Sequence, residues 1–298
     1  MKILVTGGNG YIGNQLIDAL KNKYNVISFD ISHEVESENN FNGDLRNKKN
    51  IRDCFYKHKN IDLVIHLAAL AGVEKSDFER NLYIQNNFIG TFNLLETMVE
   101  NKCEELLFAS SCSVYGNNKH ASETDPLEPE SFYGLTKVIC EELIKFYSKR
   151  HNIKYKIFRI FNVIGGYKDN KFFNSRIIPT LLKNIKKNKE INLFVKSNGK
   201  EFCNRDYVDI LFLIETIEKF LKINGNEIIN IGTGIKTNGE EIAKNCFSVT
   251  KKVSKINKTI KRVGDPDDSV SNNQKINKYI GLQKRSILEI IKQINDLI

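Results

Sequence analysis

The sequence predicts an α/β protein in which a doubly wound parallel sheet is joined to a smaller C-terminal lobe. Apolar strand-like runs alternate with helical patterns through the first half, and glycines at positions 7, 10 and 13 directly follow the first run. Such alternation implies a parallel sheet covered by helices on both faces. The expected strands are Ile3–Thr6, Val26–Asp30, Leu63–Leu67, Leu106–Ser110 and Tyr155–Phe161, with helices near 11–22, 47–57, 79–101 and 133–150.

The second half of the chain is less regular. Residues 172–205 mix one basic helix with turn residues, and short helices are expected within 240–298. We therefore predict a first domain over residues 1–164, to which 206–231 returns, and a smaller lobe over 165–298. In open α/β sheets ligands bind beyond the carboxyl ends of the strands. That rule points to Gly7–Gly13, Asp30, Ala68–Ala71, Ser110–Ser113 and Asn162.

The glycine-rich turn at the N-terminus indicates a dinucleotide-binding site. A strand that turns sharply into a helix points backbone N–H groups at an anion, and Gly7, Gly10 and Gly13 allow a close approach to a pyrophosphate. Tyr11 and Ile12 lie in the same turn. Asp30, at the end of the next run, can accept hydrogen bonds from ribose hydroxyls and repel a 2′-phosphate, which favours NAD over NADP. An ordinary glycine-rich turn and a solvated aspartate are the plainer alternatives.

Composition restricts the possible partners. The chain has 298 residues and a net charge of +9, but its lysines are dispersed among asparagines, which is typical of a solvated face rather than a nucleic-acid site. The six cysteines lack metal-type spacing and indicate reduced thiols. The most apolar stretch, 61–73, is too short to span a bilayer, and Met1 leads directly into the first strand. We expect a cytoplasmic protein with no metal, membrane or nucleic-acid partner.

The residues that could carry chemistry follow in two places. Tyr133 and Lys137 lie four residues apart at an expected helix start, so their side chains share a face. An ammonium near a phenol favours the phenolate, which could then act as a general base near neutral pH. Ser110 to Gly116 follows another strand, and a serine there could hydrogen-bond the same substrate oxygen. A turn or capping serine is the plainer alternative.

Several segments together resemble the extended short-chain dehydrogenase/reductases, specifically the nucleotide-sugar epimerases. In order and spacing the resemblance covers nearly the whole chain and implies a Rossmann domain. The matching segments are Thr6–Gly13, Asp30, Gly43–Arg46, His66–Ala69, Asn87–Thr91, Ser110–Gly116, Tyr133–Lys137, Arg159–Asn162, Asn204–Tyr207, Asn230–Gly234 and Arg262–Pro266.

The resemblance implies roles for individual residues. Ser111 and Tyr133 contact the sugar 4-hydroxyl, with Tyr133 as the base, and Lys137 binds the nicotinamide ribose and lowers the tyrosine pKa. Cofactor contacts are implied for Asp44 and Leu45 at the adenine and for Ala68, Ala69 and Asn87. The nucleotide diphosphate is implied to bind Asn162, Arg205, Tyr207, Arg262 and Asp265. Arginine forks also suit phosphate oxygens on chemical grounds alone.

The chain departs from the family pattern at three places. Ala71 stands where the family has a lysine, Leu211-Phe212 replaces an acidic pair, and Asn272 replaces an aspartate, with Lys275 retained. None of these departures touches the Ser111, Tyr133 and Lys137 set.

Two residues beside Ser111 distinguish between reactions. Related dehydratases carry an Asp-Glu pair at the positions of Cys112 and Ser113, and related decarboxylases carry the glutamate. Neither cysteine nor serine can supply that acid–base chemistry at neutral pH. The favoured function is therefore an NAD-dependent UDP-hexose 4-epimerase. The alternatives are a 4-keto nucleotide-sugar reductase or dehydrogenase and, from another class, a non-catalytic NAD-sensing or RNA-binding protein.

The resemblance has two further implications. It suggests a homodimer formed through the helices near 79–101 and 133–150. Ser269 occupies the position that borders the sugar C2 substituent in the family, where a small residue admits an N-acetyl group. We therefore expect both UDP-glucose and UDP-N-acetylglucosamine as substrates. A solvent-facing turn residue is the alternative for Ser269.

Overall fold

The structure is a computed structural model that describes residues 1–32, 37–166 and 176–298. The chain divides into two compact units, each held together by its internal contacts. Unit 1 comprises 1–115, 126–159 and 220–229, and unit 2 comprises 116–125, 160–219 and 230–298. Of the segment predicted to return to the first domain, 220–229 therefore belongs to unit 1, whereas 206–219 belongs to unit 2. Residues 167–175 of the predicted lobe lie outside the described residues.

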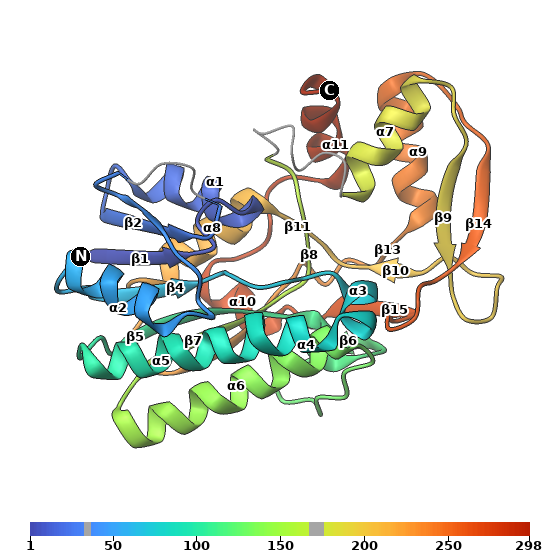
Figure 1. The fold of residues 1–298 in the computed structure, drawn as a ribbon. Coiled ribbons are helices and arrows are strands. Elements are labelled where there is room, and N and C mark those ends of the chain that lie inside the picture. The colour runs from blue at the N-terminus through green and yellow to red at the C-terminus, as the bar shows by residue number, and fades with distance from the viewer. Residues whose placement is uncertain (33–36, 167–175) are drawn as a thin grey trace. The chain divides into compact units, whose positions relative to one another are not determined.

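Unit 1 is built on a seven-stranded sheet in the order β12-β7-β5-β4-β1-β2-β3 (Figure 1). The pairs β1–β2, β1–β4, β2–β3 and β4–β5 are parallel, which confirms the predicted fold class. Sequence patterns missed the short β3 and the edge strand β12. The bounds are β1 Lys2–Thr6, β2 Asn25–Asp30, β3 Asn40–Asn42, β4 Leu63–His66, β5 Glu105–Ser111, β7 Lys154–Ile160 and β12 Glu227–Ile231.

Helices cover both faces of this sheet (Figure 1). On one face α2 (Lys48–Lys57), α5 (Gly90–Glu100) and α6 (Phe132–His151) pack apolar side chains such as Leu94, Met98 and Ile144 against the strands. On the other face lies α1 (Tyr11–Leu20), with Leu16 and Leu20 fully buried. These amphipathic helices bury one apolar stripe each, as a two-layered core requires.

The single helix predicted over 79–101 is wrong in detail. The structure instead has α3 (Val73–Phe78), α4 (Arg80–Tyr83), a π-helix η1 (Ile84–Ile89) and then α5. Within η1 the side-chain amide of Asn87 donates to the carbonyl of Leu70 at 3.0 Å and accepts from its N–H at 2.8 Å. The Asn87 side chain thus bonds the π-helix to the segment after β4. Short π segments often mark functional sites.

Unit 2 contains three small sheets, ordered β13-β10-β15-β6, β11-β8 and β14-β9. Asp206 joins several of these segments, because its fully buried carboxylate accepts hydrogen bonds from Thr233, Gly234 and Ser271. The strands are β6 Asn118–Ala121, β8 Asn162–Ile164, β9 Ile191–Val195, β10 Asn204–Arg205, β11 Tyr207–Asp209, β13 Thr237–Asn238, β14 Ile256–Ile260 and β15 Asp268–Ser271. The helices are α7 Ile177–Lys186, α8 Ile210–Phe220, α9 Gly239–Thr250, α10 Gln274–Tyr279 and α11 Ile287–Asp296.

Candidate active site

The loops after β1 and β4 meet at the point where the strand order of unit 1 reverses. Gly7 has φ +72°, and a Cβ built there would lie 2.8 Å from the backbone nitrogen of Ala68. A Cβ at Gly13 would lie 2.1 Å from the carbonyl oxygen of Gly7. No side chain can therefore replace either hydrogen without moving backbone. Gly10 caps α1 without any side-chain hydrogen bond to the first turn, so the backbone here suits an anion.

Asp30 lies at the carboxyl end of β2, beside this glycine turn. One carboxylate oxygen accepts the backbone N–H of Asn9 at 3.1 Å, and the other accepts the N–H and hydroxyl of Ser32 at 2.9 and 2.7 Å. These bonds fix the carboxylate next to the turn predicted to bind pyrophosphate. Contact between Asp30 and a cofactor ribose stays a prediction.

The remaining predicted cofactor residues differ in how they are placed. Ala68 and Ala69 are partly exposed beside the glycine turn. Asp44 forms a bidentate ion pair with Arg46, which lowers the pKa of Asp44. Leu45 is buried in the core, and so is Asn87. The Asn87 amide bonds Leu70 and also Thr136, so it joins the segment after β4 to α6, and its predicted cofactor contact stays a prediction.

The structure brings the start of α6, which carries Tyr133, close to the turn that follows Ser111, the last residue of β5. This turn is a short 3₁₀ helix, η2 (Cys112–Tyr115). A Cβ at Gly134 would lie 2.5 Å from the carbonyl oxygen of Ser113, so the start of α6 packs against the turn at backbone distance. The Ser111 hydroxyl is 3.1 Å from the Ser113 hydroxyl and also accepts the Ser113 N–H at 3.1 Å. The segments that carry Ser111 and Tyr133 therefore meet at Ser113.

Three side chains fix the first turn of α6, which carries Tyr133. Ser131 accepts the N–H of Gly134 as the helix N-cap, Ser76 accepts the N–H of Tyr133, and Asp77 accepts the N–H of Phe132. Such caps satisfy backbone donors that a helix leaves unpaired. Ser76 and Asp77 were not among the predicted site residues. Their partners are more than fifty residues away in the sequence, and no motif around them indicates this contact.

Lys137 is nearly fully buried beneath Tyr133. Its ammonium donates to the carbonyl of Ala109 at 2.7 Å and lies 4.6 Å from the centre of the Phe108 ring. Burial lowers the pKa of Lys137 to about 8, opposed by the nearby Cys140 thiol and the Glu141 carboxylate. The lysine is thus positioned between the end of β5 and the tyrosine, as the four-residue spacing predicted.

The residues predicted to bind the nucleotide diphosphate all lie in unit 2. Asn162 on β8 pairs with Tyr207 on β11, and its amide donates to the carbonyl of Asp206. Arg205 on β10 donates to the carbonyl of Asn204 at 2.8 Å. Arg262 forms an ion pair with Asp265 at 2.9 Å and stacks over the Phe194 ring. The Arg262 side chain is 43% exposed, so it retains access to a ligand.

Ser269 lies inside the same unit 2 sheet. It pairs with Arg205 on β10 and with Asn118 on β6, and it is 5% exposed. The alternative of a solvent-facing turn residue is therefore wrong. The register places Ser269 directly beside a residue predicted to bind the diphosphate.

Known proteins resemble this chain both in sequence and in fold. A family profile described as "NAD dependent epimerase/dehydratase family" matches residues 3–232. The chain belongs to this family.

Individual relatives of this epimerase/dehydratase chain match over nearly their full length. UDP-glucose 4-epimerase of Lactobacillus helveticus is 30% identical, covering 94% of this chain and 91% of the relative. The crystal structure of UDP-glucose 4-epimerase from Thermus thermophilus with NAD has 27% identity and a TM-score of 0.89, covering 99% of this chain and 98% of that one. MoeE5 in complex with UDP-glucuronic acid and NAD has 26% identity and a TM-score of 0.88, with the same coverage.

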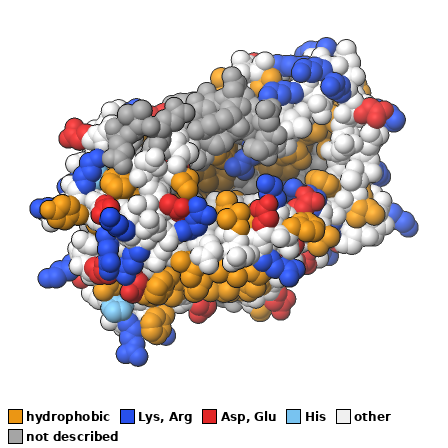
Figure 2. Space-filling model, in the orientation of Figure 1, with side chains coloured by type: hydrophobic (Ala, Val, Ile, Leu, Met, Phe, Trp, Pro, Cys, Tyr) orange, Lys and Arg blue, Asp and Glu red, His pale blue; other side chains and the backbone are white. Residues whose placement is uncertain are grey.

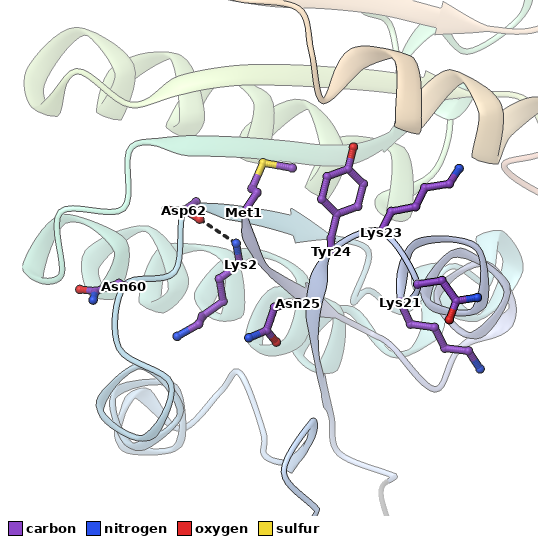
Figure 3. A pocket seen from close by; sticks show the side chains of 9 residues that line it. Met1, Lys2, Lys21, Lys23, Tyr24, Asn25, Asn60 and Asp62 are labelled. Carbon is purple, nitrogen blue, oxygen red and sulfur yellow. Dashed lines mark hydrogen bonds between the residues drawn. The ribbon is translucent and has the colours of Figure 1, made fainter.

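An NAD-dependent family requires a dinucleotide site, and the residues present fit one. The glycine turn leaves no room for side chains, and Asp30 is oriented beside it. A separate hollow of about 680 Å³ lies at the opposite end of the sheet, lined by Met1, Lys2, Lys21, Tyr24, Asp62 and their neighbours (Figure 3). There Asp62 accepts the backbone N–H of Lys2. This hollow adjoins the amino ends of β1 and β2. In sheets of this kind ligands bind beyond the carboxyl ends of the strands, so the hollow is not the family's cofactor site.

No helix within residues 1–32, 37–166 and 176–298 is long and apolar enough to cross a membrane. Among those residues no three His, Cys, Asp or Glu side chains gather in a way that could bind a metal ion.

Proposed function

We propose that this protein is an NAD-dependent UDP-hexose 4-epimerase. The observation that carries the proposal is the cluster of Ser111, Tyr133 and Lys137 at the end of β5, with Cys112 and Ser113 where a dehydratase needs a carboxylate pair. Ser113 bonds Ser111 through both its N–H and its hydroxyl. In the proposed reaction Tyr133 acts as the base for one hydroxyl, and positions 112 and 113 supply no carboxylate for an elimination.

Each residue has a separate task in the proposed reaction. Tyr133 takes the proton of the sugar 4-hydroxyl, and Ser111 hydrogen-bonds the same oxygen. Lys137 stabilises the tyrosine in its deprotonated form through its positive charge. NAD bound at the glycine turn would supply the acceptor and donor for the hydride at C4, and addition to the opposite face of the 4-keto sugar would invert C4. As C4 is reduced again, Tyr133 returns the proton to the oxygen.

The substrate's two halves make different demands on the protein. The inversion requires the hexose to turn over while the nucleotide stays bound, so binding energy should come from the diphosphate. The arginines of unit 2 suit that task, because guanidinium groups bind phosphate oxygens in a bidentate manner. We assign Asn162, Arg205, Tyr207, Arg262 and Asp265 to the nucleotide diphosphate.

The small Ser269 supports a broader substrate range. Removing side-chain volume beside C2 leaves space for an acetamido group, and the serine hydroxyl could hydrogen-bond its carbonyl. We propose that UDP-glucose and UDP-galactose are substrates together with their N-acetylamino forms.

The decisive experiment incubates the pure protein with each of these four nucleotide sugars and follows their interconversion by NMR. An epimerase converts each sugar to its C4 epimer without net NADH formation. Stoichiometric consumption of cofactor would instead establish the reductase or dehydrogenase alternative. Absence of any turnover, with NAD still bound, would favour a sensing protein.

We also propose that the protein forms a homodimer through α5 and α6. These helices lie side by side, and the visible face over them carries a band of hydrophobic side chains (Figure 2). On α6 the exposed apolar residues recur at helical spacing and form one stripe. The exposed residues of this face are Leu82, Ile84, Phe92, Leu135, Ile139 and Phe146. A second copy with the same face offers a matching apolar surface, as a two-fold interface requires.

A further inference from the structure

A fully buried ion pair lies directly behind the Ser111 turn. Glu141 on α6 is 0% exposed and Arg159 on β7 is 2% exposed. The guanidinium donates to both carboxylate oxygens, at 3.1 and 2.8 Å. A buried pair of charges is costly to desolvate and contributes little net stability compared with apolar residues of similar volume. Packing alone therefore does not account for this pair.

Each charge of the pair also bonds a residue that flanks Ser111. The carboxylate of Glu141 accepts the hydroxyl of Ser110 at 2.5 Å. The guanidinium of Arg159 donates to the Tyr115 hydroxyl at 2.8 Å and lies 5.0 Å from the centre of that ring. Ser110 precedes Ser111 on β5, and Tyr115 ends the 3₁₀ turn that follows it. The ion pair thus fixes the chain on both sides of the Ser111 hydroxyl.

Lys137 adds a third point of attachment from the same helix. It lies one turn before Glu141 on α6 and donates to the carbonyl of Ala109, the residue before Ser110. The helix that carries the proposed base therefore also fixes the strand end that carries the serine. Three attachments thus join α6 and β7 to the chain on either side of Ser111.

We infer that Glu141 and Arg159 are positioning residues, which place the Ser111 hydroxyl against the oxygen that Tyr133 deprotonates. The inference rests on the proposed function, since it assigns Ser111 to the sugar 4-hydroxyl. Both side chains are buried and bonded to each other inside unit 1. Their effect is transmitted through Ser110 and Tyr115, and it concerns the chemical step rather than binding.

The test removes the two connections and leaves the ion pair in place. In Ser110→Ala and Tyr115→Phe the Glu141–Arg159 bonds remain, so the buried charges stay compensated and folding is preserved. We expect kcat for UDP-glucose epimerisation to fall about tenfold in each variant, because small misplacements of a catalytic group are costly. KM and the NAD dissociation constant should stay within about twofold. Tyr147→Phe is the matched control, because it removes from α6 a hydroxyl that is bonded to Glu96 on α5.

A double-mutant cycle separates positioning from general destabilisation. In a Ser111→Ala background we expect Ser110→Ala and Tyr115→Phe to change kcat by less than about twofold, because effects transmitted through one residue are not additive. An unchanged kcat in the single variants, or an equal loss with and without Ser111, would overturn the inference. No epimerisation by the parent protein would instead overturn the proposed function and, with it, this assignment.

Discussion

The ammonium group of Lys137 lies 5.9 Å from the centre of the Tyr133 ring, one helical turn along α6. The same ammonium is anchored to the carbonyl of Ala109. A cation fixed at this distance from a phenol and shielded from water acts on it more strongly than an exposed lysine would. The proposed base Tyr133 and the lysine proposed to activate it are therefore both carried by α6.

Replacing Tyr133 by Phe should reduce kcat by about 10²–10⁴-fold, the usual loss when a general base is removed. Binding of NAD and of UDP-sugar should remain near normal, because the phenyl ring keeps its packing. Turnover assays combined with isothermal titration of both ligands measure the two effects. A variant that retains more than about a tenth of the parent rate would show that another group is the base.

The rate should fall above about pH 8, where Lys137 loses its proton, since its pKa is lowered to about 8 by burial. Stability should move in the opposite direction. In the unfolded chain the lysine stays protonated up to its ordinary pKa of 10.5, so between pH 8 and 10.5 the unfolded state binds more protons and the free energy of unfolding gains from rising pH. Measuring kcat from pH 6 to 10, with urea unfolding at pH 7 and 9, separates the two. An alkaline loss of rate that tracks unfolding would contradict this explanation.

Cofactor choice should depend on Asp30. In Asp30→Ala we expect weaker NAD binding and a smaller difference between NAD and NADP, since the carboxylate both pairs with the ribose and repels a phosphate. Fluorescence titration with both reduced dinucleotides tests this, with Asp18→Ala on the exposed side of α1 as the control. Equal affinity of the parent protein for the two would show that Asp30 does not discriminate.

Substrate range should depend on Ser269. Ser269→Tyr should abolish turnover of UDP-N-acetylglucosamine and retain that of UDP-glucose, because steric exclusion acts on the larger substrate. Ser269→Ala is the matched control and should process both. If the parent protein accepts UDP-glucose but not the N-acetyl sugar, Ser269 does not border an open pocket.

The oligomeric state should respond to a charge placed on the α6 stripe. Ile139→Glu should convert a dimer to a monomer in sedimentation velocity, because a carboxylate there would have to be desolvated at the interface. Val253→Glu, at an exposed position of unit 2, should leave the dimer intact. A parent protein that sediments as a monomer would rule out this interface.

The glycine turn after β1 and the placement of Tyr133 and Lys137 on one helix could be predicted because their signals are local. Gly7, Gly13 and the Tyr133/Lys137 spacing each lie within one turn of chain, where sterics and helical geometry determine placement. The π-helix could not, since the apolar periodicity of 79–101 does not distinguish one wider turn within a helix. The bond between Glu141 and Arg159 joins a helix to a strand. Nothing in the sequence near either residue indicates that the two side chains pair, because their contact depends on how α6 packs against the sheet.

The carboxylate of Asp206 has a consequence for how unit 2 opens in solution. Its partners come from the segment after β12 and from β15, and it lies between Arg205 and Tyr207, both assigned to the substrate. If any one of these segments is released, the buried Asp206 carboxylate loses a hydrogen bond. A buried carboxylate without its hydrogen-bond partners is energetically costly. The amides of Thr233, Gly234 and Ser271 should therefore exchange with solvent in a single cooperative opening. We therefore expect a substitution at Asp206 to lower ligand affinity, although the Asp206 carboxylate is bonded to groups of the protein.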